Sequence, residues 1–238
     1  NPAYISKPDQ KLFDEMQEKC GELIKLAAIA PETEGAMEFI RENKKRTVLS
    51  LAHTTADYDT AMKAFGEGAS HVTHLYNAMP PYSHRAPGVV GAAADSGAEA
   101  ELICDGVHIH PAAVRTTFKM LGEDKIIFIS DSMMATGLED GDYSLGGQAV
   151  KVTGTLATLK DGTIAGSATN LMDCMRRAVL DMKIPLEKAV KCAAVNPAKS
   201  VGIYDQYGSI TAGKIANLVL LRKSDLSLYK VVLKGQVL

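Results

Sequence analysis

The chain has 238 residues, of which 46% are hydrophobic and 23% charged, and its net charge is −2. This composition is typical of a globular protein with enough apolar material for a large core. It argues against nucleic-acid binding, because no basic block is present, and against a membrane span, because no run of about 18 apolar residues occurs. Four widely spaced cysteines without a C-x-x-C pair predict free thiols in a reducing compartment, which favours a cytoplasmic protein.

Short apolar runs recur along the first half of the chain and predict β-strands. They show little polar alternation, which is typical of strands buried on both faces of a parallel sheet. Their spacing of about 20–30 residues matches one strand plus one helix. The predicted strands lie at 23–32, 47–55, 71–79, 100–110 and 125–132.

Amphipathic patterns between these strands predict helices. One is expected over 33–44, with Thr33 as its N-cap, and another over 55–65. A third is expected over 111–121, because Pro111 suits a first helical position and Gly122 ends the pattern. Alternating strands and helices of this length predict an α/β fold.

The second half of the chain departs from this alternation. Residues 142–167 are rich in glycine, threonine and valine and predict an antiparallel β-hairpin insertion. Helices are expected over 170–183 and 186–195, and Asn196 is expected to cap a further turn. The tail predicts short strands separated by glycine turns. We therefore expect a catalytic domain over 1–205 and part of a small β-domain over 206–238.

Two parallel architectures, an open doubly wound sheet and a closed barrel, fit the strand–helix alternation. The open dinucleotide-binding sheet is disfavoured, because no G-x-G-x-x-G follows a strand. The polar residues at the ends of several strands favour a barrel, in which function gathers at the carboxyl ends. We predict an incomplete (β/α)8 barrel of about five strands, with strand-end candidates His53, His74, Asp105, His108 and Asp131.

The two strand-end histidines are candidates for metal binding. His53 and His74 end consecutive predicted strands 21 residues apart, and imidazole is a common ligand of zinc or iron. A structural, hydrogen-bonded histidine is the alternative reading for each. Two ligands do not complete a catalytic metal site, which needs about three protein groups.

Asp131 is the candidate acid/base residue. It follows the apolar strand "IIFIS", where a carboxylate is poorly solvated and calls for a functional partner. His108 and Arg85 are candidates for substrate contacts, and Glu32 is undecided, whereas His71, His84 and His110 are left as structural or solvated. No G-x-S-x-G elbow competes. These residues suggest hydrolysis by a metal-activated water.

Eight segments of the chain have distinctive sequences: "LAHTTA" (51–56), "THLYNAMPP" (73–81), "HRAPG" (84–88), "CDGVHIHP" (104–111), "ISDSMMATG" (129–137), "IAGSATNLMDCMR" (164–176), "NPAKSVGI" (196–203) and "GSITAGKIANLVLL" (208–221). Together they resemble the N-acetylglucosamine-6-phosphate deacetylases of the amidohydrolase superfamily. The resemblance covers nearly the whole chain, and "THLYNAM" is its most specific block.

The resemblance implies a role for each matched position. It makes His53 and His74 ligands of a divalent metal and Asp131 the general acid/base. It makes Asn77, Ala78, Arg85 and His108 the groups that bind a phosphorylated amino sugar, with Ala78 acting through its backbone N–H. In this family the arginine can come from a second subunit, which implies a homodimer.

The resemblance also places this chain in the C-terminal part of such an enzyme. The family's remaining metal ligands would precede Asn1, where the chain opens on "NPAYISKPDQ" without an initiator methionine. The function implied for the complete protein is hydrolysis of N-acetyl-D-glucosamine 6-phosphate to D-glucosamine 6-phosphate and acetate. Two alternatives stay open: a metal amidohydrolase acting on a cyclic amide, and an inactive fragment that lacks metal ligands.

Overall fold

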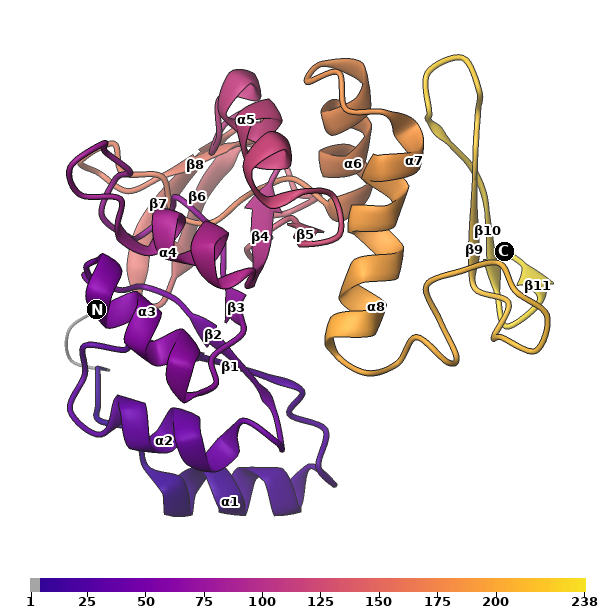
Figure 1. Cartoon of the computed structure of the whole chain (residues 1–238). Helices are drawn as coiled ribbons and strands as arrows, with labels where there is room; N and C mark the ends of the chain where they lie inside the picture. The colour runs from indigo at the N-terminus through magenta and orange to yellow at the C-terminus, as the bar shows by residue number, and fades with distance from the viewer. Residues whose placement is uncertain (1–4) are drawn as a thin grey trace. The chain divides into compact units, whose positions relative to one another are not determined.

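The computed structural model describes residues 5–238, and its elements are shown in chain order in Figure 1. The chain forms two compact units, one ending at Leu102 and one starting at Ile103. Each unit is described by itself below. Within residues 5–238, no helix combines the length and the apolar character needed to cross a membrane.

The first unit is built on parallel strands that follow one another in chain order. Strand β1 pairs with β2, β2 with β3, and β3 with β4, so that Ser50 lies opposite His71 and His71 opposite Glu99. Consecutive residues of β2 are buried, as expected for a strand covered on both faces. The bounds are β1 Leu26–Ile29, β2 Val48–Leu51, β3 His71–Val72 and β4 Glu99–Ile103.

Four helices accompany these strands: α1 (Gln10–Lys19), α2 (Ala36–Asn43), α3 (Tyr58–Glu67) and α4 (Gly88–Ser96). The helices predicted at 33–44 and 55–65 are present as α2 and α3, but the prediction of Thr33 as an N-cap is wrong. Gly35 precedes α2 with φ 84°, a left-handed backbone that glycine adopts at little cost, and the helix therefore starts later.

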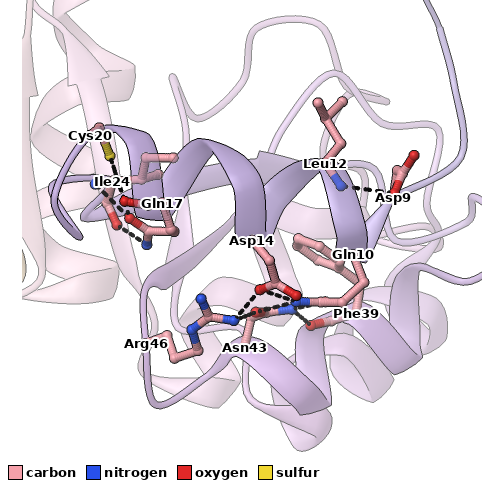
Figure 2. A network of polar contacts seen from close by, with 10 residues as sticks. All are labelled: Asp9, Gln10, Leu12, Asp14, Gln17, Cys20, Ile24, Phe39, Asn43 and Arg46. Atoms are coloured by element: carbon pink, nitrogen blue, oxygen red, sulfur yellow. Dashed lines mark hydrogen bonds and ion pairs between the residues drawn. The ribbon is translucent and has the colours of Figure 1, made fainter.

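A network of polar side chains joins α1 to α2 within this unit (Figure 2). The amide groups of Gln10 and Asn43 donate to one another's oxygens, and Arg46 donates to Asp14 at 2.5 Å. The buried Gln17 accepts from the backbone N–H of Ile24 and donates to its carbonyl, which fixes the chain just before β1. Of these residues Asn43 and Gln17 are buried, and the bonds satisfy amide groups that would otherwise lack partners there.

The second unit contains β5 (Ile126–Ile129), whose apolar side chains are nearly all buried, and α5 (Pro111–Leu121). Helix α5 has the predicted bounds, with Pro111 in its first turn and Gly122 after its end. The predicted insertion is also confirmed as an antiparallel sheet of β6 (Gly141–Leu145), β7 (Gln148–Thr153) and β8 (Leu156–Thr158). The insertion has its own apolar core of Met133, Ala135, Val150, Val152, Ala157 and Ala165.

The remaining elements of this unit are helices followed by a small antiparallel sheet. Helix α6 (Leu171–Leu180) starts at Asn170, whose side chain accepts from the N–H of Asp173. Then come α7 (Leu186–Val190), a π-helical turn η2 (Lys191–Val195) and α8 (Asn196–Ser200). The tail forms the expected strands β9 (Leu218–Leu221), β10 (Leu228–Leu233) and β11 (Gln236–Val237), seen in yellow in Figure 1.

Asn196 does not cap a helix, so that prediction is wrong. Its backbone is helical, and its buried amide nitrogen donates to the carbonyls of Glu123 and Ile126, at 2.7 Å each. The side chain therefore holds the start of β5. All four cysteines are free, as predicted. The domain boundary proposed near residue 205 stays a prediction.

Candidate functional site

The turns after β2 and β3 bring the two predicted metal ligands together. His53 and His74 follow these strands with positive φ angles of 46° and 34°, a backbone region that non-glycine residues rarely adopt. Their Nε2 atoms lie 3.0 Å apart, and their ring planes meet at 80°. Such strained backbone persists only where the surrounding contacts enforce it, and it is often found at functional sites.

The geometry of this histidine pair fits two ligands of one metal ion. Two imidazole nitrogens held at about 2.0–2.1 Å in tetrahedral zinc geometry would lie about 3.3 Å apart. His53 is exposed, whereas His74 is buried, so the pair opens toward solvent on one side only. Within residues 5–238, no cluster of three or more histidine, cysteine, aspartate or glutamate side chains suited to a metal is found. The metal-binding role of His53 and His74 stays a prediction.

The two histidine turns are also joined through their backbones. The N–H of Thr54 donates to the carbonyl of Ala78 at 3.1 Å, and the N–H of Asn77 donates to the carbonyl of His74 at 2.9 Å. The Asn77 amide nitrogen donates to the carbonyls of His74 and Leu75. Asn77 therefore shapes the turn that carries His74, and Ala78 is exposed beside it. Their predicted contacts with a phosphorylated sugar stay predictions.

A buried polar group supports the turn after β3. The Oγ of Ser50 lies 2.8 Å from Nδ1 of His71 and 2.6 Å from Oγ1 of Thr73. Burial lowers the pKa of His71 to about 4, so the ring is neutral at pH 7 and its 3.8 Å approach to Glu101 is not an ion pair. Glu101 also accepts a hydrogen bond from the N–H of His74. The structural reading of His71 suits this geometry.

Glu32, undecided from the sequence, follows β1 and binds the turn after His53. One carboxylate oxygen accepts from Oγ1 of Thr54 at 2.5 Å, and the other accepts from the N–H and Oγ1 of Thr55 at 2.6 and 3.1 Å. Partial burial alone would raise the pKa of Glu32, but these hydrogen bonds favour the anion and lower it overall. Glu32 is thus an anion that contacts the His53 turn.

In the second unit, Asp131 follows β5 with a φ of 51°. Its carbonyl accepts from the N–H of Ser167 at 2.9 Å, and Oγ of Ser132 donates to the carbonyl of Thr169 at 2.7 Å. The expectation of a poorly solvated carboxylate is wrong, because the side chain of Asp131 is exposed. The left-handed turn takes the residue out of the buried strand. Its acid/base role stays a prediction.

His108 lies in a turn after β4 and is oriented by Asp105. The buried carboxylate of Asp105 lies 2.7 Å from Nδ1 of His108 and accepts from the N–H groups of Val107 and His108 at 2.9 Å. Burial would raise the pKa of Asp105, but these bonds outweigh it and lower the pKa. The sequence predicts Asp105 at a strand end but indicates no role for it. The Asp-Gly dipeptide three residues before His108 was the available signal.

The other candidates lie apart from these contacts. Arg85 is exposed in the loop before α4 in the first unit. His110 caps α5, because its Nδ1 accepts from the N–H of Ala112. The substrate-binding roles of Arg85 and His108 are not tested by these contacts and stay predictions.

Comparisons with known proteins identify close relatives. The chain is 42% identical over 98% of its length to N-acetylglucosamine-6-phosphate deacetylase of Bacillus subtilis and covers 59% of that protein. It is 35% identical over 90% of its length to N-acetylgalactosamine-6-phosphate deacetylase of Escherichia coli O157:H7, of which it covers 57%. The chain thus spans about 60% of the length of these relatives.

Solved structures of such deacetylases share the fold of this chain. A variant of N-acetyl-D-glucosamine-6-phosphate deacetylase from Mycobacterium smegmatis, solved with N-acetyl-D-glucosamine-6-phosphate, superposes with a TM-score of 0.94 and 33% identity, over 100% of this chain and 63% of that one. This likeness confirms the predicted fold class, part of a metal-dependent hydrolase (β/α)8 barrel with added antiparallel sheets. The sequence model of the Amidohydrolase family matches residues 24–238. The chain belongs to the amidohydrolase family.

Proposed function

We propose that the complete protein hydrolyses the N-acetyl group of N-acetyl-D-glucosamine 6-phosphate, giving D-glucosamine 6-phosphate and acetate in amino-sugar catabolism. The observation that carries this proposal is the His53–His74 pair, whose Nε2 atoms lie 3.0 Å apart after the ends of neighbouring parallel strands. The pair occurs in a chain that is 42% identical to a deacetylase of this name. The geometry supports a metal site, and the relatives' names supply the substrate.

A divalent ion, zinc or iron for these nitrogen donors, would polarise the amide carbonyl and activate water. His53 and His74 would hold it together with further ligands. Asp131 would accept the proton of the attacking water and return it to the departing amine nitrogen, so that one carboxylate serves as base and then as acid. The exposure of Asp131 leaves its carboxylate accessible for this proton transfer.

Polar groups from several turns would bind the phosphate end of the substrate. Asn77 and the N–H of Ala78 would contact it from the turn that also carries His74. Nδ1 of His108 faces Asp105, which leaves Nε2 on the other side of the ring to contact the sugar phosphate. Arg85 would add a guanidinium, supplied by a second copy in a homodimer. The four free thiols suit a cytoplasmic enzyme.

The test is acetate release by the complete, metal-loaded protein from three substrates: N-acetylglucosamine 6-phosphate, its unphosphorylated form and N-acetylgalactosamine 6-phosphate. We expect kcat/KM to be at least about 100-fold higher with the phosphate than without it, because charge-assisted contacts to the phosphate would be lost. The rate with N-acetylgalactosamine 6-phosphate, which differs from the glucosamine substrate at C4, distinguishes between the two kinds of deacetylase among the relatives.

Equal rates with and without phosphate would overturn the phosphosugar assignment, and a preference for a cyclic amide such as a dihydropyrimidine would favour the alternative hydrolase. The fragment alternative needs a separate measurement. We expect residues 1–238 expressed alone to show no deacetylation and to aggregate, because an open barrel exposes unpaired strand edges. A monomeric, cooperatively melting and active preparation would contradict this expectation.

A further inference from the structure

Glu32 is an anion at the carboxyl end of β1 for which the proposed reaction has no direct use. Both of its carboxylate oxygens are engaged by the residues that directly follow His53, namely Thr54 and Thr55. A carboxylate with both oxygens occupied in this way is poorly placed to bind a metal or to transfer a proton. Its contacts instead hold a short piece of backbone.

That backbone is strained and carries a candidate ligand. His53 has a φ of 46°, and the contacts seen for its exposed ring in the described structure are those to His74. The ring of His74 is buried and held by packing, whereas the orientation of the His53 ring depends more on its backbone. Contacts that fix residues 54 and 55 therefore fix His53.

The hydrogen bonds of Glu32 are part of a local hydrogen-bond network. Oγ1 of Thr54 donates to Glu32 and accepts from the N–H of Ala56 at 2.9 Å, while the N–H of Thr54 donates to the carbonyl of Ala78. Thr54 is buried, so an unpaired hydroxyl there would be costly. Removing the carboxylate would leave Thr54 without its acceptor and the N–H of Thr55 without its own.

We propose that Glu32 is a positioning residue, which clamps the Thr54–Thr55 turn from the neighbouring strand and thereby holds His53 in the orientation that binds the metal. This inference rests on the proposed metal site of His53 and His74. Groups that orient metal ligands from outside the coordination shell typically contribute about 10–100-fold to metal affinity. Glu32 would act in this way through two backbone-linked threonines.

The test uses Co2+ as the probe in the complete protein, because the intensity and position of its visible absorption bands depend on coordination geometry. We expect Glu32→Ala to weaken Co2+ binding by about 10–100-fold and to change the spectrum of the bound ion. Glu32→Gln, which keeps one carbonyl oxygen, should show a smaller effect in the same direction. Glu67→Gln is the matched control, because Glu67 also binds through both oxygens, to Arg41 on α2.

If Glu32→Ala does not fold, Thr54→Val removes the hydroxyl that reaches Glu32 with little change of shape, and Thr54→Ser restores it. We expect the valine variant to show the altered spectrum and weaker binding, and the serine variant to recover both. A wild-type protein that binds Co2+ and deacetylates its substrate, with Glu32→Ala or Thr54→Val unchanged in affinity and spectrum, overturns this inference alone. A wild-type protein that binds no Co2+ overturns it together with the proposed function.

Discussion

The turns after β2 and β3 and the loop after β5 begin alike and are completed differently. Each places a non-glycine residue in left-handed backbone two residues after the end of a largely buried strand: His53, His74 and Asp131. In the first unit the two side chains meet, with Nε2 atoms 3.0 Å apart. In the second unit the side chain of Asp131 is exposed, and its carbonyl is held by Ser167.

The same left-handed backbone can therefore present groups of different chemistry. A left-handed residue ends a strand abruptly and turns its side chain away from the core, which suits any group that must be presented at the carboxyl edge. Only in the histidine turns do neighbouring strands bring two such groups to one point. The first unit therefore brings two imidazole rings together, whereas the loop after β5 presents one exposed carboxylate.

The largest effect should come from Asp131, if its carboxylate transfers the proton as proposed. Asp131→Asn keeps the backbone carbonyl that binds Ser167 and removes the basic oxygen. We expect kcat to fall by about 100- to 10,000-fold, the usual contribution of a general acid or base, with little change in the unfolding midpoint. Steady-state kinetics of the complete protein measure this effect. Asp205→Asn, another exposed carboxylate of the second unit, is the control.

Retained activity in Asp131→Asn would mean that Asp131 ends β5 but that its carboxylate transfers no proton in the reaction. The two regions would then share the backbone feature alone.

A change at the histidine pair should act on metal binding before turnover. His74→Ala removes one of the two facing nitrogens, so we expect the Zn2+ affinity of this variant to fall by more than about 100-fold. Residues that only orient a metal ligand contribute up to about 100-fold, and a ligand itself should contribute more. His84→Ala removes an exposed histidine from a loop of the same unit and should bind Zn2+ as wild type does. Competition with a chromophoric chelator gives both affinities. Equal affinities would show that the facing rings are a structural contact.

Elements with local start and stop signals were predictable from the sequence. Helix α5 has the expected bounds because Pro111 and Gly122 act within one turn of its ends. Helix α1 was missed, although Asp9 caps it, because only Phe13 and Gln17 are buried on its inner face. Helix α4 was missed because its glycine, alanine and valine residues are apolar on every side and give no 3.6-residue period.

The candidate site was predictable in its strand-end residues but not in their partners. His53 and His74 follow apolar runs, and parallel strands bring such ends together. The role of Glu32 depends on residues 22 and 23 positions away, and no local pattern reports such a contact. The exposure of Asp131 was misjudged, because an apolar strand does not reveal the left-handed turn that follows it.

The buried histidine below the β3 turn should make stability depend on pH. The pKa of His71 is about 4 in the folded protein and about 6.5 when unfolded, so the unfolded chain binds more protons between these values. The neutral ring's contribution is complete above pH 6.5 and is lost as the pH falls to 4. The loss is on the order of 3 kcal/mol at pH 4.

Urea unfolding of the complete protein at several pH values measures this loss. His71→Asn places an amide near Ser50 and does not titrate in this range, so the wild-type stability should fall relative to the variant as the pH drops from 6.5 to 4. Parallel pH curves would show that the proton on His71 is not linked to folding. The histidine turns would then lack this acid-sensitive support.

The smallest expected effect concerns the segment that binds the Asp131 loop. Gly166 has a φ of 65°, and a Cβ there would lie 3.2 Å from Cβ of Met133 and 3.5 Å from the carbonyl oxygen of Asp131. Gly154 has a similar φ of 60° with no atom within 4 Å of its Cβ position, so its substitution measures the backbone cost alone.

Each substitution by alanine should lower the free energy of unfolding by about 1–2 kcal/mol, because alanine is strained in left-handed backbone. Gly166→Ala should add a loss of kcat, because crowding at Met133 displaces Asp131. Equal kcat values in the two variants would show that the position of the Asp131 carboxylate does not depend on this segment, and that the loop after β5, unlike the histidine turns, tolerates displacement.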